Sequence, residues 1–78
     1  MKVFVFLPGD GLLEPFPYGQ FDFDVMPQAG QFLQFTELEG ADYPIERVGY
    51  IQDENAFIGA LWLGAPMKRE SLVGYRNR

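Results

Sequence analysis

The 78-residue sequence contains no cysteine and no histidine. Disulfides are therefore excluded, and the usual ligands of zinc, haem and iron–sulfur centres are missing. Sites built on an imidazole base or a thiolate nucleophile are excluded as well. Apart from tyrosine, the hydroxyl nucleophiles are Thr36 and Ser71, and the amine candidates are Lys2 and Lys68. We expect no cofactor, no metal centre and no enzymatic activity.

Carboxylates are the groups that remain for acid–base or metal chemistry. Asp22 and Asp24 are two residues apart, so on a strand both lie on one face. Glu37 and Glu39 have the same spacing. A hard cation such as calcium takes about six to eight oxygen ligands, more than either pair supplies. We interpret both pairs as solvated surface charge.

Long apolar runs are also missing. The run Val3–Leu7 stops at Pro8, short of the roughly 7–15 residues of a secretory h-region and of the roughly 20 of a membrane helix. We interpret residues 2–7 as the first strand. The absence of cysteine fits a reducing compartment. We expect a cytoplasmic protein that contacts no membrane.

Basic residues are scarce in most of the chain. Residues 1–67 carry ten acids against Lys2 and Arg47, a net charge of −8, whereas residues 68–78 carry +3. Nucleic-acid-binding proteins meet phosphate with a basic face, so we expect no direct contact with nucleic acid. We divide the chain into a β-barrel domain over 1–67 and a basic C-terminal tail over 68–78. The tail is either a solvated terminus or a contact for an acidic partner.

Aromatic residues, in contrast, are abundant: eight Phe, four Tyr and one Trp. Each ring brings about 150–250 Å² of surface to bury, and a chain this short buries only about 60–65% of the surface of its unfolded form. The rings therefore exceed what so small a core holds. Because large exposed apolar patches mark interfaces, we expect a protein partner, with a second copy in a homodimer as the first candidate.

Short apolar runs recur between Phe21 and Trp62, separated by Pro, Gly, Asp and Asn. Their spacing of about ten residues is typical of a small all-β meander. Pro15 and Pro17 exclude a helix in the segment 8–20, which we predict to be a long irregular loop. The predicted strands are residues 2–7, 21–25, 31–37, 43–52 and 56–63, and the predicted turns are 27–30, 39–42 and 53–55.

Two of these runs carry further detail. In 43–52 the alternation of apolar residues slips by one, and we place the bend at Gly49. In 56–63, Gly59 and the preceding hairpin signal favour a strand over a helix. On that strand Phe57, Leu61 and Leu63 lie on one side, and Ile58, Ala60 and Trp62 lie on the other. Residues 66–75 form either a short C-terminal helix or, over 72–75, a closing strand.

Five strands of this length predict an all-β fold, a small SH3-like or OB-like barrel whose closure removes exposed edges. The runs Met26–Leu33 and Tyr43–Tyr50 resemble a pattern in small uncharacterised bacterial and phage barrels of the SH3-like kind. There a Pro-x-x-Gly turn opens one strand and a Tyr-x-Val-x-x-Val strand follows; Ile45 stands where that pattern prefers valine. The resemblance implies a bacterial or phage barrel and carries over no catalytic residue.

The aromatic residues are also the candidate binding site. Most of the rings are expected in the core, and those left exposed could grip an extended proline-rich peptide. Base stacking would need a basic groove. The candidate partner-binding residues are Phe16, Tyr18, Tyr50 and Trp62. Tyr50 and Trp62 lie on strands expected to be neighbours, which makes them the first pair to consider.

These observations predict a non-enzymatic protein-interaction module. The alternative is an acidic decoy of phage or mobile-element origin, which mimics nucleic acid and inhibits a DNA-binding protein. Binding by a decoy should fall steeply with salt, whereas binding in an aromatic groove should hardly change. The decoy requires a row of acids on neighbouring strands, for which the candidates are Asp22, Asp24, Glu37, Glu39, Asp42 and Glu46.

Overall fold

The computed structural model describes residues 1–9, 14–38 and 40–68, and the regular structure in these ranges is all β. Within these ranges no helix is long and apolar enough to cross a membrane. The all-β fold class predicted from the sequence is confirmed. The strands are β1 (Lys2–Leu7), β2 (Phe16–Asp22), β3 (Phe32–Leu33), β4 (Ala41–Asp53), β5 (Ala56–Leu63) and β6 (Met67–Lys68).

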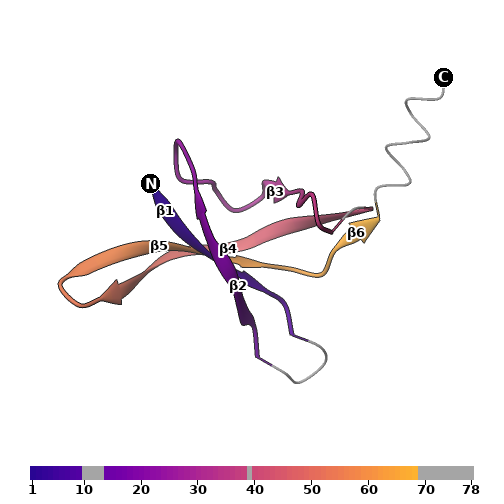
Figure 1. The fold of residues 1–78 in the computed structure, drawn as a ribbon. Helices are drawn as coiled ribbons and strands as arrows, with labels where there is room; N and C mark the ends of the chain where they lie inside the picture. Colours follow the sequence, from indigo (N-terminus) through magenta and orange to yellow (C-terminus); the bar gives the residue numbers. More distant parts are fainter. Residues whose placement is uncertain (10–13, 39, 69–78) are drawn as a thin grey trace.

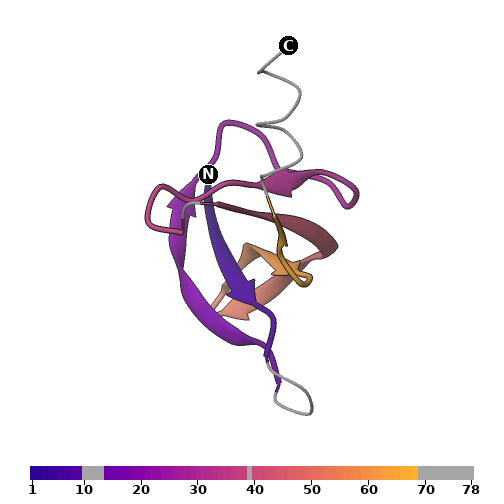
Figure 2. The same cartoon turned by 90° about the vertical axis from the view of Figure 1, so that its right-hand side faces the viewer.

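The strands form one mixed sheet in the order β2-β1-β5-β4-β3, and β6 pairs with the beginning of β4 (Figure 1). The sheet curls into a half-barrel, and the chain between β2 and β3 passes over its open side (Figure 2). The meander predicted from the sequence is wrong in one respect: β1 does not neighbour only β2 but also pairs in parallel with β5. A parallel neighbour requires a long connection, and β2, β3 and β4 together provide it.

The core lies on one face of the sheet. Alternate residues of β1 and β5 point to this face, and they are joined there by Ile45 of β4. Loop and strand aromatics such as Phe21 and Phe35 pack against them from the open side of the half-barrel. The buried residues of the core cluster are Val3, Val5, Leu7, Ile45, Leu61 and Leu63.

The slip predicted in the 43–52 strand is present as a β-bulge. The pairing of β4 with β5 shifts between Ile45 and Arg47, so Glu46 is the extra residue. The bend lies there, whereas the sequence predicts it at Gly49. A bulge returns the apolar alternation to the core face, so Ile45 and Val48, three residues apart, both pack into the core.

The segment 8–20 is not one long loop, because β2 begins at Phe16. Pro17 is tolerated there because β2 is the edge strand of the sheet, where a residue without an N–H group loses no ladder hydrogen bond. The register of β1 with β2 shifts beside Pro17, where Val5 pairs with Gly19 and Phe6 with Pro17. The prolines therefore excluded a helix but not a strand.

Two other predicted strands are shorter than expected. The strand predicted over 21–25 ends at Asp22, and the one predicted over 31–37 contains only Phe32–Leu33. In both places the chain leaves the sheet to cross the core. Of the predicted C-terminal helix, Met67–Lys68 is a strand, and residues 69–78 lie outside the described ranges. The strands predicted over 2–7 and 56–63 are confirmed at both ends.

Candidate functional site

The four aromatic residues predicted to bind a partner do not form one site. Phe16 is exposed at the beginning of β2, and Tyr50 is 62% exposed on β4. Tyr18 and Trp62 are both half-buried. Tyr50 pairs with Gly59, whereas Trp62 pairs with Arg47. Positions 59 and 62 point to opposite faces of β5, so Tyr50 and Trp62 are not the contiguous pair that the sequence predicted.

Tyr18 belongs to the packing on the core side. Its ring centroid lies 6.0 Å from that of Phe21 and 5.1 Å from that of Phe35. Phe35 in turn contacts Tyr43 edge-on at 5.7 Å. The hydroxyl of Tyr18 donates a 3.2 Å hydrogen bond to Oε1 of Glu37. These contacts hold the β3–β4 connection against the sheet, which is a structural role.

The environment of Tyr18 makes its titration testable. Partial burial raises the pKa of its phenol above the ordinary value of 10.0, and the Glu37 carboxylate raises it further. The contribution of this group to stability is therefore complete below about pH 10 and is lost as the pH rises through the raised pKa. The difference in phenolate absorbance between the wild-type protein and Tyr18→Phe reports the titration of Tyr18, and we expect its midpoint above pH 10. Glu37→Gln should lower the midpoint of the Tyr18 titration. An unchanged midpoint in Glu37→Gln would contradict this assignment.

Trp62 lies instead on the opposite face of the sheet, in an aromatic stack. Its ring is parallel to that of Phe6, with centroids 5.3 Å apart and an interplanar angle of 8°. The guanidinium carbon of Arg47 lies 4.7 Å from the centre of the indole ring. Gly49 provides room for the indole, because a Cβ atom there would lie 3.3 Å from it. Phe6 and Arg47 both pack on the indole, so Trp62 is only half exposed.

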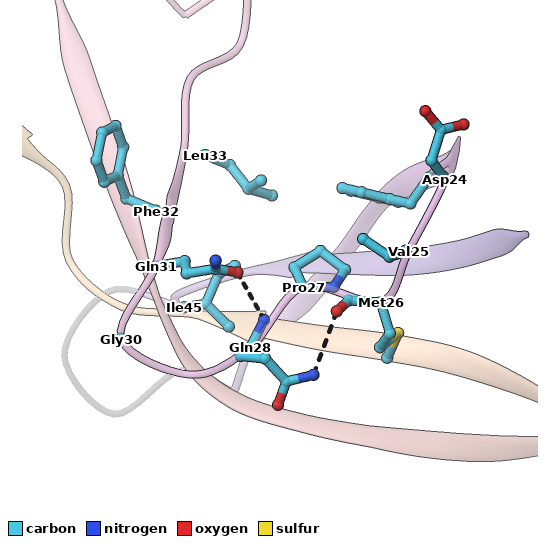
Figure 3. A pocket seen from close by; sticks show the side chains of 11 residues that line it. Asp24, Val25, Met26, Pro27, Gln28, Gly30, Gln31, Phe32, Leu33 and Ile45 are labelled. Carbon is cyan, nitrogen blue, oxygen red and sulfur yellow. Dashed lines mark hydrogen bonds between the residues drawn. The ribbon is translucent and has the colours of Figure 1, made fainter.

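A concave site lies elsewhere in the described part of the chain, where the segment between β2 and β3 crosses the core (Figure 3). It is an open cavity of about 860 Å³, which we name the loop cavity. Figure 3 shows Leu33 and Pro27 facing each other across it, with Gln28 and Gln31 at one side. Its lining residues are Phe23, Asp24, Val25, Met26, Pro27, Gln28, Gly30, Gln31, Phe32, Leu33 and Ile45.

Backbone contacts set the shape of the loop cavity. The N–H of Gly30 donates to the carbonyl of Ile45 at 3.1 Å, and the N–H of Ile45 donates to the carbonyl of Gln31 at 2.8 Å. These bonds tie the turn to β4, and Gly30 has a φ of 97°, which favours glycine. The tie fixes Ile45, which together with Pro27 is buried and forms the floor of the cavity.

The rim of the loop cavity is apolar and exposed. Val25 is 74% exposed and Phe32 is 51% exposed. The sequence predicts a strand over residues 21–25, whereas β2 ends at Asp22, so Val25 was not among the candidate binding residues. The adjacent Phe32 and Leu33 were the available signal, since two neighbouring apolar residues on a short strand point to opposite sides. Leu33 packs on the core and Phe32 is left on the rim.

The polar groups of the cavity are two glutamine amides and one carboxylate. Oε1 of Gln31 accepts a 2.8 Å hydrogen bond from the N–H of Gln28, and Nε2 of Gln28 donates to the carbonyl of Met26 at 3.2 Å. Within the described ranges no hydrogen bond uses the other atom of either amide, Gln28 Oε1 or Gln31 Nε2. Asp24 is the single charged residue of the lining.

The acids named for a decoy that lie on strands are divided between different strands of the sheet, β2 and β4. Asp22 lies on β2, 3.5 Å from Nζ of Lys2, whereas Asp42 and Glu46 lie on β4, and β1 and β5 separate these strands. Asp42 is buried and accepts a hydrogen bond from Gln34. Glu39 lies outside the described ranges. Among the residues that the structure does describe, no three acids are grouped to hold a metal ion.

The loop cavity therefore offers a ligand apolar contact, and its polar groups can form hydrogen bonds with the backbone amides of that ligand. Its lining contains no hydroxyl, amine or guanidinium group, so it presents no nucleophile other than the Asp24 carboxylate. This arrangement is suited to binding. No protein-family model, no curated protein and no solved structure matches this chain.

Proposed function

We propose that this chain is a non-enzymatic protein-interaction module that binds an extended segment of a partner protein in the loop cavity. The observation that carries the proposal is the exposed apolar rim, Val25 and Phe32, above a floor formed by buried Pro27 and Ile45. Exposed apolar surface around a concave site is typical of an interface. Such a site receives one or two large apolar anchors, which contribute most of the binding energy.

The amides support an extended peptide as the ligand. Gln28 Oε1 can accept from a peptide N–H, and Gln31 Nε2 can donate to a peptide carbonyl. β3 is also the last strand of the sheet, and β4 lies on one side of it. An extended segment that enters the cavity therefore runs beside a strand edge, where main-chain hydrogen bonds give affinity and side-chain pockets give specificity.

The negative charge of the cavity and of the chain narrows the class of partner segment further. Asp24 lines the cavity without a neighbouring cation in the lining, and the chain carries a net charge of −5. The matching segment has large apolar side chains with a Lys or Arg beside them. An exposed ion pair of this kind contributes only about 0.2–1 kcal/mol, so the apolar anchors provide most of the affinity.

The test is a selection of peptides from a random display library against the full chain, followed by titration of the selected peptide. We expect a consensus with apolar anchors and an adjacent basic residue. Phe32→Ser removes a rim wall without touching the buried floor, and it should weaken binding at least tenfold, or about 1.4 kcal/mol. Asp24→Asn should weaken binding by a factor of about two to five.

The matched control is Phe16→Ser. Phe16 is 48% exposed, close to the 51% of Phe32, but it lies at the opposite end of β2 from the cavity. This variant should keep the affinity of the wild-type protein. Equal binding by the wild-type protein and Phe32→Ser would contradict the proposal. A steep loss of binding with salt would favour the acidic decoy instead.

A further inference from the structure

The hairpin of β4 and β5 has an edge that no described strand pairs with. β3 pairs with β4 at Tyr43 and Pro44, and the turn at Gly30 and Gln31 bonds to Ile45. Beyond the bulge, among the described strands only β5 pairs with β4. The ends of the two strands project from the body as an arm (Figure 1). A two-stranded arm is marginally stable alone, so a third strand on this edge would stabilise it.

This edge lacks the features that normally block strand pairing. Proteins protect edges with proline, inward charges or bulges, and the opposite edge of the sheet, β2, contains Pro17 beside a register shift. The arm edge runs from Val48 to Gln52 and contains neither proline nor a charged residue. Tyr50, at its centre, is 62% exposed.

The direction of the backbone groups on the arm follows from its turn. Asp53 pairs with Ala56 across the two-residue turn Glu54-Asn55, and the pair that closes such a turn is hydrogen-bonded. Because hydrogen-bonded pairs alternate along an antiparallel ladder, Ile51 and Gly49 also bond to β5. The backbone groups of Val48, Tyr50 and Gln52 therefore point to the free edge.

We infer that this edge pairs antiparallel with the same edge of a second copy, about a two-fold axis at Tyr50. In this register the backbone of Tyr50 bonds to its counterpart, and Val48 bonds to Gln52 of the partner subunit. Arg47 then lies opposite Asp53 of the partner subunit, and the symmetry creates this ion pair twice. Both residues are exposed in the single chain.

The match of opposite charges distinguishes this register from its neighbours. A two-fold axis one residue earlier or later places Arg47 opposite Ile51 or Asn55 of the partner subunit. A two-fold axis midway between two residues would place each residue whose N–H and C=O point to the free edge opposite a residue whose N–H and C=O point toward β5. No hydrogen-bonded ladder forms in that arrangement. In the inferred ladder, Arg47 and Asp53 of the partner subunit form a non-hydrogen-bonded pair. The side chains of such pairs lie closer together than those of hydrogen-bonded pairs, with Cβ atoms about 4.5–5.5 Å apart. The inferred interface is distinct from the loop cavity.

The test is the solution mass of the full chain across concentration, by light scattering or sedimentation. We expect a reversible dimer. Arg47→Asp places two like-charged carboxylates opposite each other at both ends of the ladder, and it should weaken the dimer about tenfold or more. Asp53→Arg should do the same. The double variant, Arg47→Asp with Asp53→Arg, should restore the dimer even though it loses the contact of Arg47 with Trp62.

A second variant tests the backbone pairing. Tyr50→Pro removes an N–H that points to the free edge and leaves the bonds between β4 and β5 in place, so it should yield a folded monomer, with the fluorescence of the single Trp62 unchanged. The control is Phe57→Ser, which removes a ring of 69% exposure on β5 away from this edge and should leave the dimer intact. A monomeric wild-type protein, a charge exchange that does not restore the dimer, or a dimer that survives Tyr50→Pro would overturn the inference.

Discussion

Leu61→Ala is expected to lower the free energy of unfolding by about 2–5 kcal/mol. Leu61 is 0% exposed and is the largest fully buried side chain in the described part of the chain. It lies on β5, paired with Val5 of β1 on one side and with Val48 of β4 on the other. Truncation there leaves a cavity between three strands whose backbones are held by ladders, so the surrounding chain cannot collapse into the space.

The loss would remove much of the stability of so small a domain, since domains are stable by only about 5–15 kcal/mol. Denaturant titration followed by Trp62 fluorescence measures it. Leu61→Met keeps the volume and should cost less than about 1.5 kcal/mol. Phe57→Ala, on the same strand but 69% exposed, should change the stability by less than about 0.5 kcal/mol. Equal effects of Leu61→Ala and Phe57→Ala would contradict the assignment of the core.

Phe35→Ala is expected to lower the free energy of unfolding by about 3 kcal/mol. Phe35 is the central ring of the aromatic cluster over the open side of the half-barrel. Its centroid lies 5.1 Å from that of Tyr18, 5.8 Å from that of Phe21 and 5.7 Å from that of Tyr43. Each aromatic pair contributes about 0.5–1.5 kcal/mol beyond the burial of its area. Loss of the ring therefore removes the anchor of the β3–β4 connection.

The same denaturant titration measures this variant, with Phe35→Leu as its control. Leucine keeps apolar volume but not the ring geometry, so it should cost roughly half as much as alanine. The tyrosine circular dichroism of Phe35→Ala should also change, because Tyr18 and Tyr43 both lose their edge-on neighbour. A cost below about 1 kcal/mol would show that the cluster is dispensable, and it would contradict its proposed role in holding the connection.

The parts of the fold that the sequence predicted correctly are those decided by neighbours along the chain. The strand 2–7 ends at Pro8, and the strand 56–63 begins after a two-residue turn, so both have strong local signals at their ends. The slip between Ile45 and Val48 is likewise visible as a break in the alternation of apolar residues. The first part of β2, residues 16–20, was missed because Pro17 is unfavourable in most strands and acceptable only at an edge, and a sequence pattern does not say which strand is the edge.

The candidate site depended on contacts between distant segments. The sequence identified the aromatic residues but not their neighbours, and it placed Tyr50 beside Trp62. The register of β4 with β5 sets them three positions apart, on opposite faces. The loop cavity was missed because Val25 and Phe32 belong to two runs that were both predicted as longer strands than the structure has. Only the path of the chain across the core leaves these two side chains exposed.

By itself, the sequence determined the chemistry and the local structure of this protein. Its lack of histidine and cysteine excludes whole classes of site, its apolar alternation specifies β-strands, and its turn residues end them. Tertiary structure alone decided the rest: the parallel pairing of β1 with β5, the edge position of β2, the loop cavity and the unpaired edge of β4. The physical reason is that strand order and register depend on pairing and packing between residues far apart in the chain, for which local propensities carry no information.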